Sequence, residues 1–252
     1  MFVKTFNIGK ALKASKVIIK LMSTLLVLVI SFYGGAYLFF NSDSYVAAIS
    51  EATEKKTIII DAGHGGEDCG AIGVSGIYEK DLNLEISTTL GDILAENGYA
   101  VVYTRTEDKL LYAEEENIKG IRKISDLKNR CKIGAEYPSS IFISVHMNSF
   151  GDSKYSGLQV YYGLKDGGSL RLAQAVQNSV KSELQESNKR VVKPGENMYI
   201  LENLENTAIL IECGFLSNPE ECEKLSQKEY QKQLCFSICC GIIEYMKTSS
   251  DN

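Results

Sequence analysis

The chain has 252 residues, of which 44% are apolar and 23% are charged, and this composition excludes a largely disordered or collagen-like protein. The whole chain has a formal charge of −5, whereas residues 1–40 contribute five lysines and no acidic residue, so residues 41–252 carry a net charge of −10. A body this acidic is poorly suited to the phosphate backbone of nucleic acid, and we expect no nucleic-acid partner.

The chain begins with the pattern of a membrane anchor. Residues 1–20 are basic, and residues 21–40 are uncharged and mostly apolar. About 20 apolar residues in a helix span the ~30 Å hydrocarbon core of a bilayer, so residues 21–40 are predicted to form a transmembrane helix. Because the lysines precede this segment, the positive-inside rule predicts that residues 1–20 are cytoplasmic and that the body is exported. A cleaved signal peptide is the alternative. Residues 41–56 have the small and polar composition of a linker.

Beyond the linker, short β-branched runs alternate with apolar residues at helical spacing. Strands are predicted at residues 57–60, 99–104, 141–145, 158–162, 198–201 and 208–211. Helices are predicted around the apolar stripes of residues 82–94, 124–135, 173–184 and 230–245. Strands that alternate with helices indicate an α/β fold, in which residues 57–247 form a single domain with helices on both faces of a mostly parallel, twisted sheet. Residues 248–252 remain as a short tail.

The seven cysteines do not form a recognisable metal-binding pattern. No two of them have Cys-x-x-Cys spacing, which disfavours a structural zinc knuckle. An odd number also prevents complete pairing within one chain. We expect most of them to be small buried apolar residues, although disulfides in an exported body remain an alternative.

Three side chains suited to metal chemistry follow predicted strands. They are the only two histidines, His64 and His146, and the acidic residue Glu212. In an open α/β sheet, ligands gather beyond the carboxyl ends of the strands, so these side chains are expected at one edge. Two imidazoles and a carboxylate are the groups that a catalytic metal requires. Taken singly, His64 is also compatible with a loop residue beside a glycine turn, and His146 with a hydrogen-bonded core histidine.

Two acidic residues have different sequence contexts. Glu212 directly follows an apolar run that should be buried, where an ionised carboxylate is costly unless a charge or a metal compensates it. Burial should raise the pKa of this carboxyl, which suits a general base that works near neutral pH. Glu79 precedes the first predicted helix, and without further information its presence is explained by the favourable interaction of an acid with a helix N-terminus.

Four segments in order resemble the zinc-dependent N-acetylmuramoyl-L-alanine amidases of the amidase-3 family. Residues 57–71, TIIIDAGHGGEDCGA, are similar to the opening motif of the family, and Glu79 stands at the family's Glu position. Residues 143–149, ISVHMNS, resemble its Ser-x-His-x-Asn segment, and residues 209–221, ILIECGFLSNPEE, resemble its Glu-x-Gly-Phe-x-Ser-Asn segment. The resemblance covers about residues 57–247, which it identifies as an amidase catalytic domain.

The resemblance implies roles for individual residues. His64, Glu79 and His146 would bind one Zn²⁺ per chain, and Glu212 would be the general base and then the proton shuttle. Asn148 would orient the region of His146.

Two arginines match the family pattern, and two positions depart from it. Arg105 and Arg130 fall where the family often has arginine, and either could contact the site or form structural ion pairs. Cys69 replaces a common proline in the first motif, and Thr207-Ala208 replaces a lead-in that contains proline. Neither departure affects an expected ligand.

The resemblance also implies a substrate and a setting. The enzyme would hydrolyse the amide bond between N-acetylmuramic acid and L-alanine in peptidoglycan. The anchor and the bare catalytic domain most resemble the germination-specific, CwlD-type spore-cortex amidases, whose product feeds a peptidoglycan deacetylase during muramic-δ-lactam formation. Because the chain has no second domain for wall binding, an accessory protein is expected. The alternatives are another zinc hydrolase of the wall, such as a peptidase or deacetylase, and a non-catalytic wall-binding module.

Overall fold

The computed structural model describes residues 20, 22–31, 33, 37, 56–112, 114–118 and 121–249. The chain divides into two compact units, residues 1–54 and 55–252. In the first unit, the described residues are helical. Residues 1–19 and the rest of the expected anchor lie outside the described residues, as do residues 41–55 of the expected linker. Of the helices that the structure describes, none has the length and apolar character needed to cross a membrane.

The second unit contains a six-stranded sheet in the order β2-β1-β3-β6-β4-β5. Neighbouring strands are parallel except for β4 and β6, which are antiparallel, so the prediction of a mostly parallel sheet is confirmed. The strands are β1 (Thr57–Ala62), β2 (Ala100–Tyr103), β3 (Ile141–Asn148), β4 (Gln159–Tyr162), β5 (Lys193–Pro194) and β6 (Thr207–Phe215).

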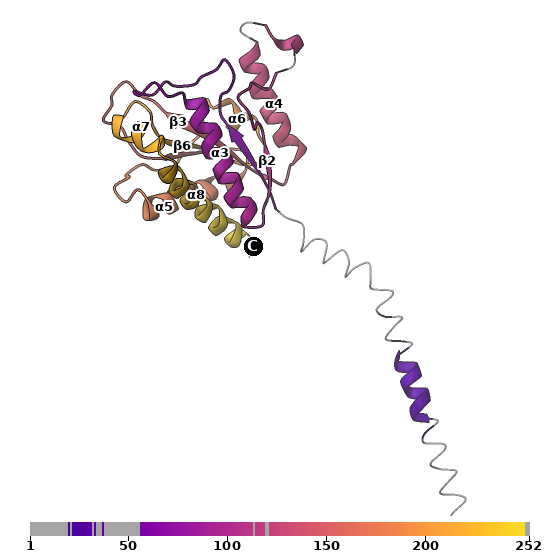
Figure 1. Cartoon of the computed structure of the whole chain (residues 1–252). Coiled ribbons are helices and arrows are strands. Elements are labelled where there is room, and N and C mark those ends of the chain that lie inside the picture. Colours follow the sequence, from indigo (N-terminus) through magenta and orange to yellow (C-terminus); the bar gives the residue numbers. More distant parts are fainter. Residues whose placement is uncertain are drawn as a thin grey trace, which may run out of the picture. The chain divides into compact units, whose positions relative to one another are not determined.

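Helices cover both faces of this sheet (Figure 1). The helices α3, α5, α7 and α8 contribute to a large apolar cluster on one face, and α4 and α6 pack against a smaller cluster on the other. In Figure 1, α3 and α8 lie side by side in front of the sheet. The helices are α3 (Glu79–Glu96), α4 (Arg122–Glu136), α5 (Gly167–Glu183), α6 (Tyr199–Asn203), α7 (Pro219–Leu225) and α8 (Lys228–Ser249), with a short 3₁₀ turn, η1 (Glu114–Glu116).

The sequence pattern of β1 explains why it is central. Ile58 and Ile60 point into the larger cluster, whereas Ile59, between them, points into the smaller one. All three side chains are fully buried. A strand that is covered on both faces therefore appears as a continuous apolar run rather than as an alternating pattern.

The prediction of a strand at residues 198–201 is wrong. This segment instead enters the short helix α6, which buries Ile200 and Leu201 against Phe142. A short apolar run does not distinguish a strand from a buried helical turn, because both need the same residues. The sequence analysis also missed α7, although Asn218 caps its first turn with a side-chain hydrogen bond to Glu221 N and Pro219 occupies the start.

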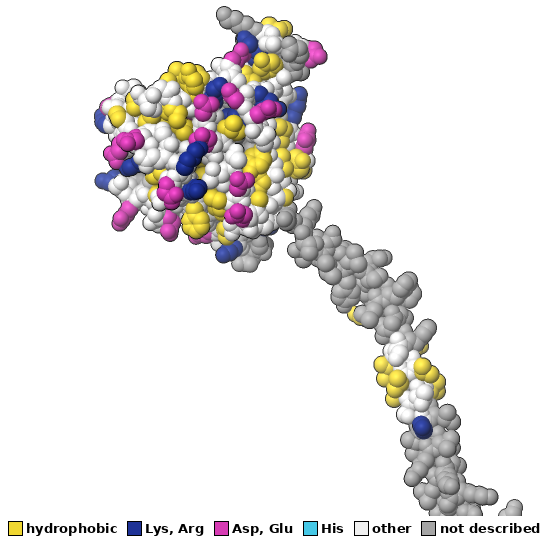
Figure 2. All heavy atoms as spheres, in the orientation of Figure 1, with side chains coloured by type: hydrophobic (Ala, Val, Ile, Leu, Met, Phe, Trp, Pro, Cys, Tyr) yellow, Lys and Arg dark blue, Asp and Glu magenta, His cyan; other side chains and the backbone are white. Residues whose placement is uncertain are grey.

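Two strands extend further than predicted. β3 continues to Asn148 and β6 to Phe215, so His146 and Glu212 lie within strands rather than after them. All seven cysteines are free thiols, and four of them are buried, as expected for small apolar residues: Cys213, Cys222, Cys235 and Cys239. Figure 2 shows acidic and basic side chains interspersed over the face on which α3 and α8 lie.

Candidate metal centre

His64 lies in the loop that leaves β1, in an unusual backbone conformation. Its φ is 61°, a left-handed conformation that costs a residue with a side chain about 1–2 kcal/mol. Two buried arginines hold this loop by its carbonyl oxygens. Arg130 Nη2 donates to His64 O at 2.8 Å, and Arg105 Nη2 donates to Gly63 O at 3.0 Å. Backbone strain that its surroundings impose is typical of functional sites.

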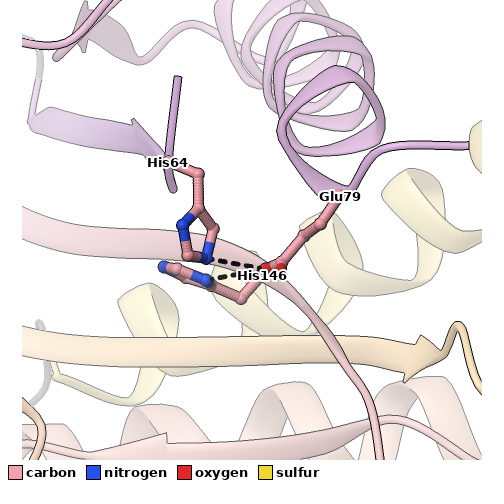
Figure 3. Close-up of side chains that lie close together, drawn as sticks. All are labelled: His64, Glu79 and His146. Atoms are coloured by element: carbon pink, nitrogen blue, oxygen red, sulfur yellow. Dashed lines mark hydrogen bonds and ion pairs between the residues drawn. The ribbon is translucent and has the colours of Figure 1, made fainter. Parts of the chain in front are cut away.

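The three expected ligands converge on one carboxylate oxygen. Glu79 Oε1 lies 3.2 Å from His64 Nε2 and 2.9 Å from His146 Nδ1. The two rings are edge to face, with their centroids 4.9 Å apart. Figure 3 shows both imidazoles directed at the carboxylate of Glu79, which reaches them from the start of α3. One donor atom from each side chain lies within 4.8 Å of the others, so the group could hold a metal ion.

Glu79 is fixed by more than the two histidines. Its Oε2 accepts a hydrogen bond from Ala71 N at 2.8 Å, and its Oε1 accepts one from Met147 N at 3.1 Å. Burial alone would raise the pKa of Glu79, but hydrogen bonds and positive charge from the two histidines hold this pKa well below its usual range. The carboxylate is therefore ionised and oriented at neutral pH, whereas a simple helix-capping acid would be free to move.

A second carboxylate, that of Asp68, contacts the other nitrogen of the His64 ring. His64 Nδ1 lies 2.9 Å from Asp68 Oδ2, which leaves Nε2 to face Glu79. Burial lowers the pKa of His64, but the hydrogen bonds and charges of Asp68 and Glu79 outweigh this effect and raise the pKa to about 9. A carboxylate on the far nitrogen is the usual way in which proteins orient a metal-binding histidine. The sequence analysis did not select Asp68, although its position four residues after His64 was a usable signal.

Two glycines make room for this packing. A Cβ atom at Gly63 would lie 2.2 Å from His146 Nε2, and one at Gly70 would lie 2.5 Å from Glu79 Oε2. Gly70 also has a positive φ of 66°. A side chain at either position would push a proposed ligand out of place, so the glycines of the first motif shape the site as well as the turn.

Glu212 stands opposite His146 in the neighbouring strand. The two residues are register partners of β6 and β3, whose axes are ~4.8 Å apart. Oε2 of Glu212 is buried and has no hydrogen-bond partner among the described residues. Burial raises the pKa of Glu212 to about 7, an effect that the charges of the two histidines reduce and that of Glu79 increases. This carboxyl can take up or release a proton near neutral pH.

A polar network lies beneath the site on the same face of the sheet. Arg130 forms ion pairs with Asp61, at 2.6 Å, and with Asp126, at 2.8 Å. Of the two roles that the sequence allowed for this arginine, the structure therefore shows the structural ion pair. Asp61 also accepts hydrogen bonds from Ser144 and Thr104. Burial would raise the pKa of Asp61, but the charge of Arg130 and these hydrogen bonds keep it below its usual value.

Arg105 and Asn148, whose expected roles are less defined, do not join the three expected ligands. Arg105 makes its hydrogen bonds to backbone carbonyl oxygens, including those of Ala62 and Lys80, so it fixes the loop rather than facing the site. Asn148 lies at the end of β3 and lines a separate cavity of about 240 Å³. The structure therefore brings His64, Glu79 and His146 together and places the other two at the periphery.

The chain is similar to known proteins over most of its length. A family model described as N-acetylmuramoyl-L-alanine amidase matches residues 58–244. The germination-specific N-acetylmuramoyl-L-alanine amidase of Bacillus subtilis (strain 168) is 34% identical over 233 residues, which cover 92% of this chain and 97% of that protein.

Solved structures are similar over about three quarters of the chain. The CwlD amidase from Clostridioides difficile, in complex with the GerS lipoprotein, has a TM-score of 0.74 and 38% identity, covering 77% of this chain and 100% of that chain. An N-acetylmuramoyl-L-alanine amidase from Clostridium difficile 630 has a TM-score of 0.67 and 32% identity, covering 77% and 98% of the two chains. The chain therefore belongs to the N-acetylmuramoyl-L-alanine amidases, enzymes that hydrolyse the amide bond between N-acetylmuramic acid and L-alanine in peptidoglycan.

Proposed function

We propose that His64, Glu79 and His146 hold one Zn²⁺ ion. Two histidines and one glutamate are an established ligand set of catalytic zinc, which leaves a fourth position open. The oxygen of Glu79 lies 2.9 and 3.2 Å from the two imidazole nitrogens. Ligand atoms around a tetrahedral zinc with bonds of ~2.0–2.1 Å are separated by similar distances, about 3.3 Å. The side chains thus fit the ion with little rearrangement.

The charges around this cluster also fit a divalent cation. Three carboxylates, those of Asp68, Glu79 and Glu212, surround only two imidazoles. Lys123 forms an ion pair with Asp68 at 3.2 Å. If both histidines are neutral, as metal binding requires, Glu79 and Glu212 still supply negative charge that a dication would balance.

Glu212 is the proposed general base. Zinc, when bound, supplies Lewis acidity that polarises the scissile carbonyl and makes water more acidic. Glu212 takes a proton from the attacking water at Oε2 and then passes it to the departing nitrogen of L-alanine. The buried oxygen without a partner, opposite His146 in the next strand, is the observation that carries this assignment. The products are the free stem peptide and a glycan strand in which the N-acetylmuramic acid has a free lactyl carboxylate.

Other residues support the reaction from a distance. Arg105 is a positioning residue, because it holds the carbonyl oxygens of Ala62 and Gly63 beside His64. Asn148 faces the neighbouring cavity, where it is proposed to contact the substrate. Residues 57–247 would form the complete catalytic domain.

The biological setting is proposed from the relatives and from the N-terminal sequence. The relative in Bacillus subtilis is germination-specific, which supports a role in the spore cortex, where bare muramic acid would be passed to a deacetylase that forms muramic-δ-lactam. The relative in Clostridioides difficile forms a complex with the GerS lipoprotein, which supports an accessory protein for this chain. Residues 21–40 are proposed to anchor the chain, so that catalysis takes place outside the cytoplasmic membrane.

The test is a product assay on purified peptidoglycan with zinc-loaded chain. We expect free stem peptides that begin with L-alanine, with the glycan intact, identified by mass spectrometry. Glu212→Gln should retain stoichiometric zinc but lower kcat by about 10²–10⁴, the usual contribution of a general base. His64→Ala should lose the zinc.

Glu229→Gln provides a matched control, because Glu229 is exposed on α8. This variant should keep both zinc and activity. Release of acetate instead of peptides would indicate a deacetylase. Full activity of Glu212→Gln with zinc bound would refute the role of this residue, and stoichiometric zinc in His64→Ala would refute the metal site.

A further inference from the structure

The cavity that Asn148 lines lies beside the proposed catalytic centre, on the side of β4 and β5. Its volume is about 240 Å³. The side chains that matter for its chemistry are Tyr155, Gln159, Tyr161, Arg190, Lys193 and Phe215. The reaction proposed above assigns none of these residues a role.

The cavity is lined by Gln159, a residue that lies next to Glu212 in the sheet. Gln159 on β4 is the register partner of Glu212 on β6. Residues directly opposite each other in an antiparallel pair have Cβ atoms about 5 Å apart and point to the same face. Tyr161, two residues further along β4, lies on that face too, and the charges of Glu212 and Arg190 both affect its pKa, which burial raises. The cavity therefore lies one strand away from the proposed general base.

Arg190 is held in this cavity with part of its hydrogen-bonding capacity free. Its Nε donates to Ser156 O at 2.8 Å, and its Nη1 donates to Gln159 Oε1 at 3.1 Å. The guanidinium lies over the ring of Phe215, 4.3 Å from the centroid, and 5.9 Å from that of Tyr155. Among the described residues, Nη2 has no hydrogen-bond partner, and a guanidinium fork fixed in this way is suited to a planar carboxylate.

The positive charge of the cavity is not neutralised by the protein. Within residues 56–112, 114–118 and 121–249, no carboxylate forms an ion pair with Arg190 or with the exposed Lys193. Glu221 is near enough to feel the charge of Arg190, but its carboxylate oxygens accept hydrogen bonds from Gly157 N and Phe215 N. Two free cations beside the active centre of a body with a net charge of −10 indicate an anionic ligand.

The order of strands tells which part of the substrate reaches this cavity. β1, β3, β6, β4 and β5 follow one another across the sheet, so the metal ligands, Glu212 and the cavity form a row. If Glu212 protonates the departing L-alanine nitrogen, the peptide side of the scissile bond lies towards the cavity. The glycan is uncharged near this bond, because the lactyl carboxyl is consumed in the amide, whereas the stem peptide has free carboxylates.

We propose that Arg190 and Lys193 bind a carboxylate of the peptidoglycan stem peptide, so that the peptide extends from Glu212 over β4 towards β5. This inference rests on the proposed function for the direction of the substrate. The aromatic rings of Tyr155 and Phe215 serve chiefly to orient the guanidinium, rather than as open platforms for a sugar ring.

The test compares two N-acetylmuramoyl-peptides that differ only in their stem carboxylates, free in one and converted to carboxamides in the other. The wild-type chain should favour the free carboxylates by about tenfold in kcat/KM, the effect expected for a charge-assisted hydrogen bond. Arg190→Gln and Lys193→Gln should each reduce this preference through KM, with kcat retained. Because the Lys193 side chain is exposed, its variant is expected to fold normally.

Arg171→Gln is the matched control, because Arg171 is exposed on α5 and lies outside the cavity. This variant should keep the full preference. Wild-type KM values for both substrates in Arg190→Gln and Lys193→Gln would overturn the inference while leaving the amidase function intact.

Binding provides a readout that does not depend on turnover. The Glu212→Gln chain should bind a stem peptide with free carboxylates more tightly than its carboxamide, by calorimetry, and adding Arg190→Gln should remove the difference. If the wild-type chain does not cleave either substrate but this difference is present, the proposed function fails and the carboxylate site stands. Equal binding of both peptides would refute the site.

Discussion

The two faces of the sheet are built differently. The face beneath α3, α5 and α8 is apolar along the whole length of its strands. The face beneath α4 and α6 is apolar only at the start of the strands. On β1 it changes from Ile59 to Asp61, and on β3 from Phe142 to Ser144 and then His146. The same strands therefore contribute a core at one end and a reactive surface at the other.

The apolar face therefore governs mainly the stability of the fold, and the polar face governs mainly the positions of the side chains at the candidate centre. The apolar face can lose packing at any one point and still hold the sheet, because its contacts are numerous and non-directional. The polar face depends on a few buried charges and hydrogen bonds, in which the loss of one partner leaves another without compensation. We therefore expect substitutions on the polar face to impair the metal centre, and those on the apolar face to affect stability alone.

Arg130→Met should have the largest effect. This change leaves Asp61 buried without its ion pair and removes the hydrogen bonds to Ala62 O and His64 O. Breaking one partner of a buried ion pair costs about 3–5 kcal/mol, so the free energy of unfolding should fall by that amount in a denaturant titration. Zinc affinity should fall as well, because the loop that carries His64 loses a support.

A double variant separates these two consequences. Adding Asp61→Asn to Arg130→Met removes the unpaired charge and should restore part of the stability. It should not restore zinc affinity, because the hydrogen bond to His64 O is still missing. If the double variant regained full affinity, the charge and not the loop support would control the metal site.

Leu90→Ala probes the apolar face and should have the next largest effect. Leu90 on α3 is fully buried in the larger cluster. Removing a buried leucine side chain costs about 2–5 kcal/mol, through lost transfer energy and the cavity left behind. Activity per folded molecule and zinc affinity should be unchanged at low temperature.

Leu170→Ala on α5 is the control, because Leu170 is 37% exposed. Its effect on the free energy of unfolding should be within about 0.5 kcal/mol. A loss of zinc affinity in Leu90→Ala, without unfolding, would show that the two faces are coupled.

The apolar face was the more predictable from sequence. The β-branched run of β1 predicts a buried strand, and the spacing of Leu82, Ile86 and Leu90 predicts the buried face of α3. The prediction failed where packing decides between two structures, as at Ile200 and Leu201 in α6. The antiparallel pairing of β4 with β6 is set by the course of the chain through α5, which local patterns do not contain.

The members of the candidate metal centre could be named from the sequence, but their geometry could not. The rarity of histidine singled out His64 and His146, and the family resemblance added Glu79. The four-residue spacing of His64 and Asp68 was a usable signal for their contact, but no pattern along the chain indicates that Arg105 binds carbonyl oxygens rather than the substrate. The arginine contacts depend on how segments distant in sequence meet, and only the three-dimensional structure contains that information.

Gly70→Ala should affect the metal centre with a smaller cost in stability. Its Cβ would lie 2.5 Å from Glu79 Oε2 and 2.8 Å from His64 Cδ2, so both proposed ligands must move. Displaced metal-site geometry typically costs about 10–100-fold in affinity, which a competition titration against a chelator would measure. The positive φ adds about 1 kcal/mol of backbone strain.

Gly76→Ala isolates the strain from the contact. Gly76 also has a positive φ, of 86°, but no atom lies within 4 Å of the position of its Cβ. This variant should lose only the stability that the backbone strain costs, about 1 kcal/mol, and keep wild-type zinc affinity. Equal affinities in the two variants would mean that Gly70 serves only the turn.

The smallest effect is expected from pH, and on the polar face it can be followed at Asp61. Burial opposes ionisation of Asp61, but the charge of Arg130 and the hydrogen bonds from Ser144 and Thr104 prevail, so the folded-state pKa lies below the unfolded value of about 3.9. The stability that Asp61 contributes is therefore complete above about pH 4 and is lost as the pH falls through the folded-state pKa.

The free energy of unfolding of the metal-free chain should decline on acidification below pH 4, and less steeply in Asp61→Asn. Leu90→Ala should lower the whole curve without changing this slope, because no ionisable group is removed. Parallel curves for the wild-type and Asp61→Asn chains would show that other carboxylates, and not the network under the metal centre, control acid stability.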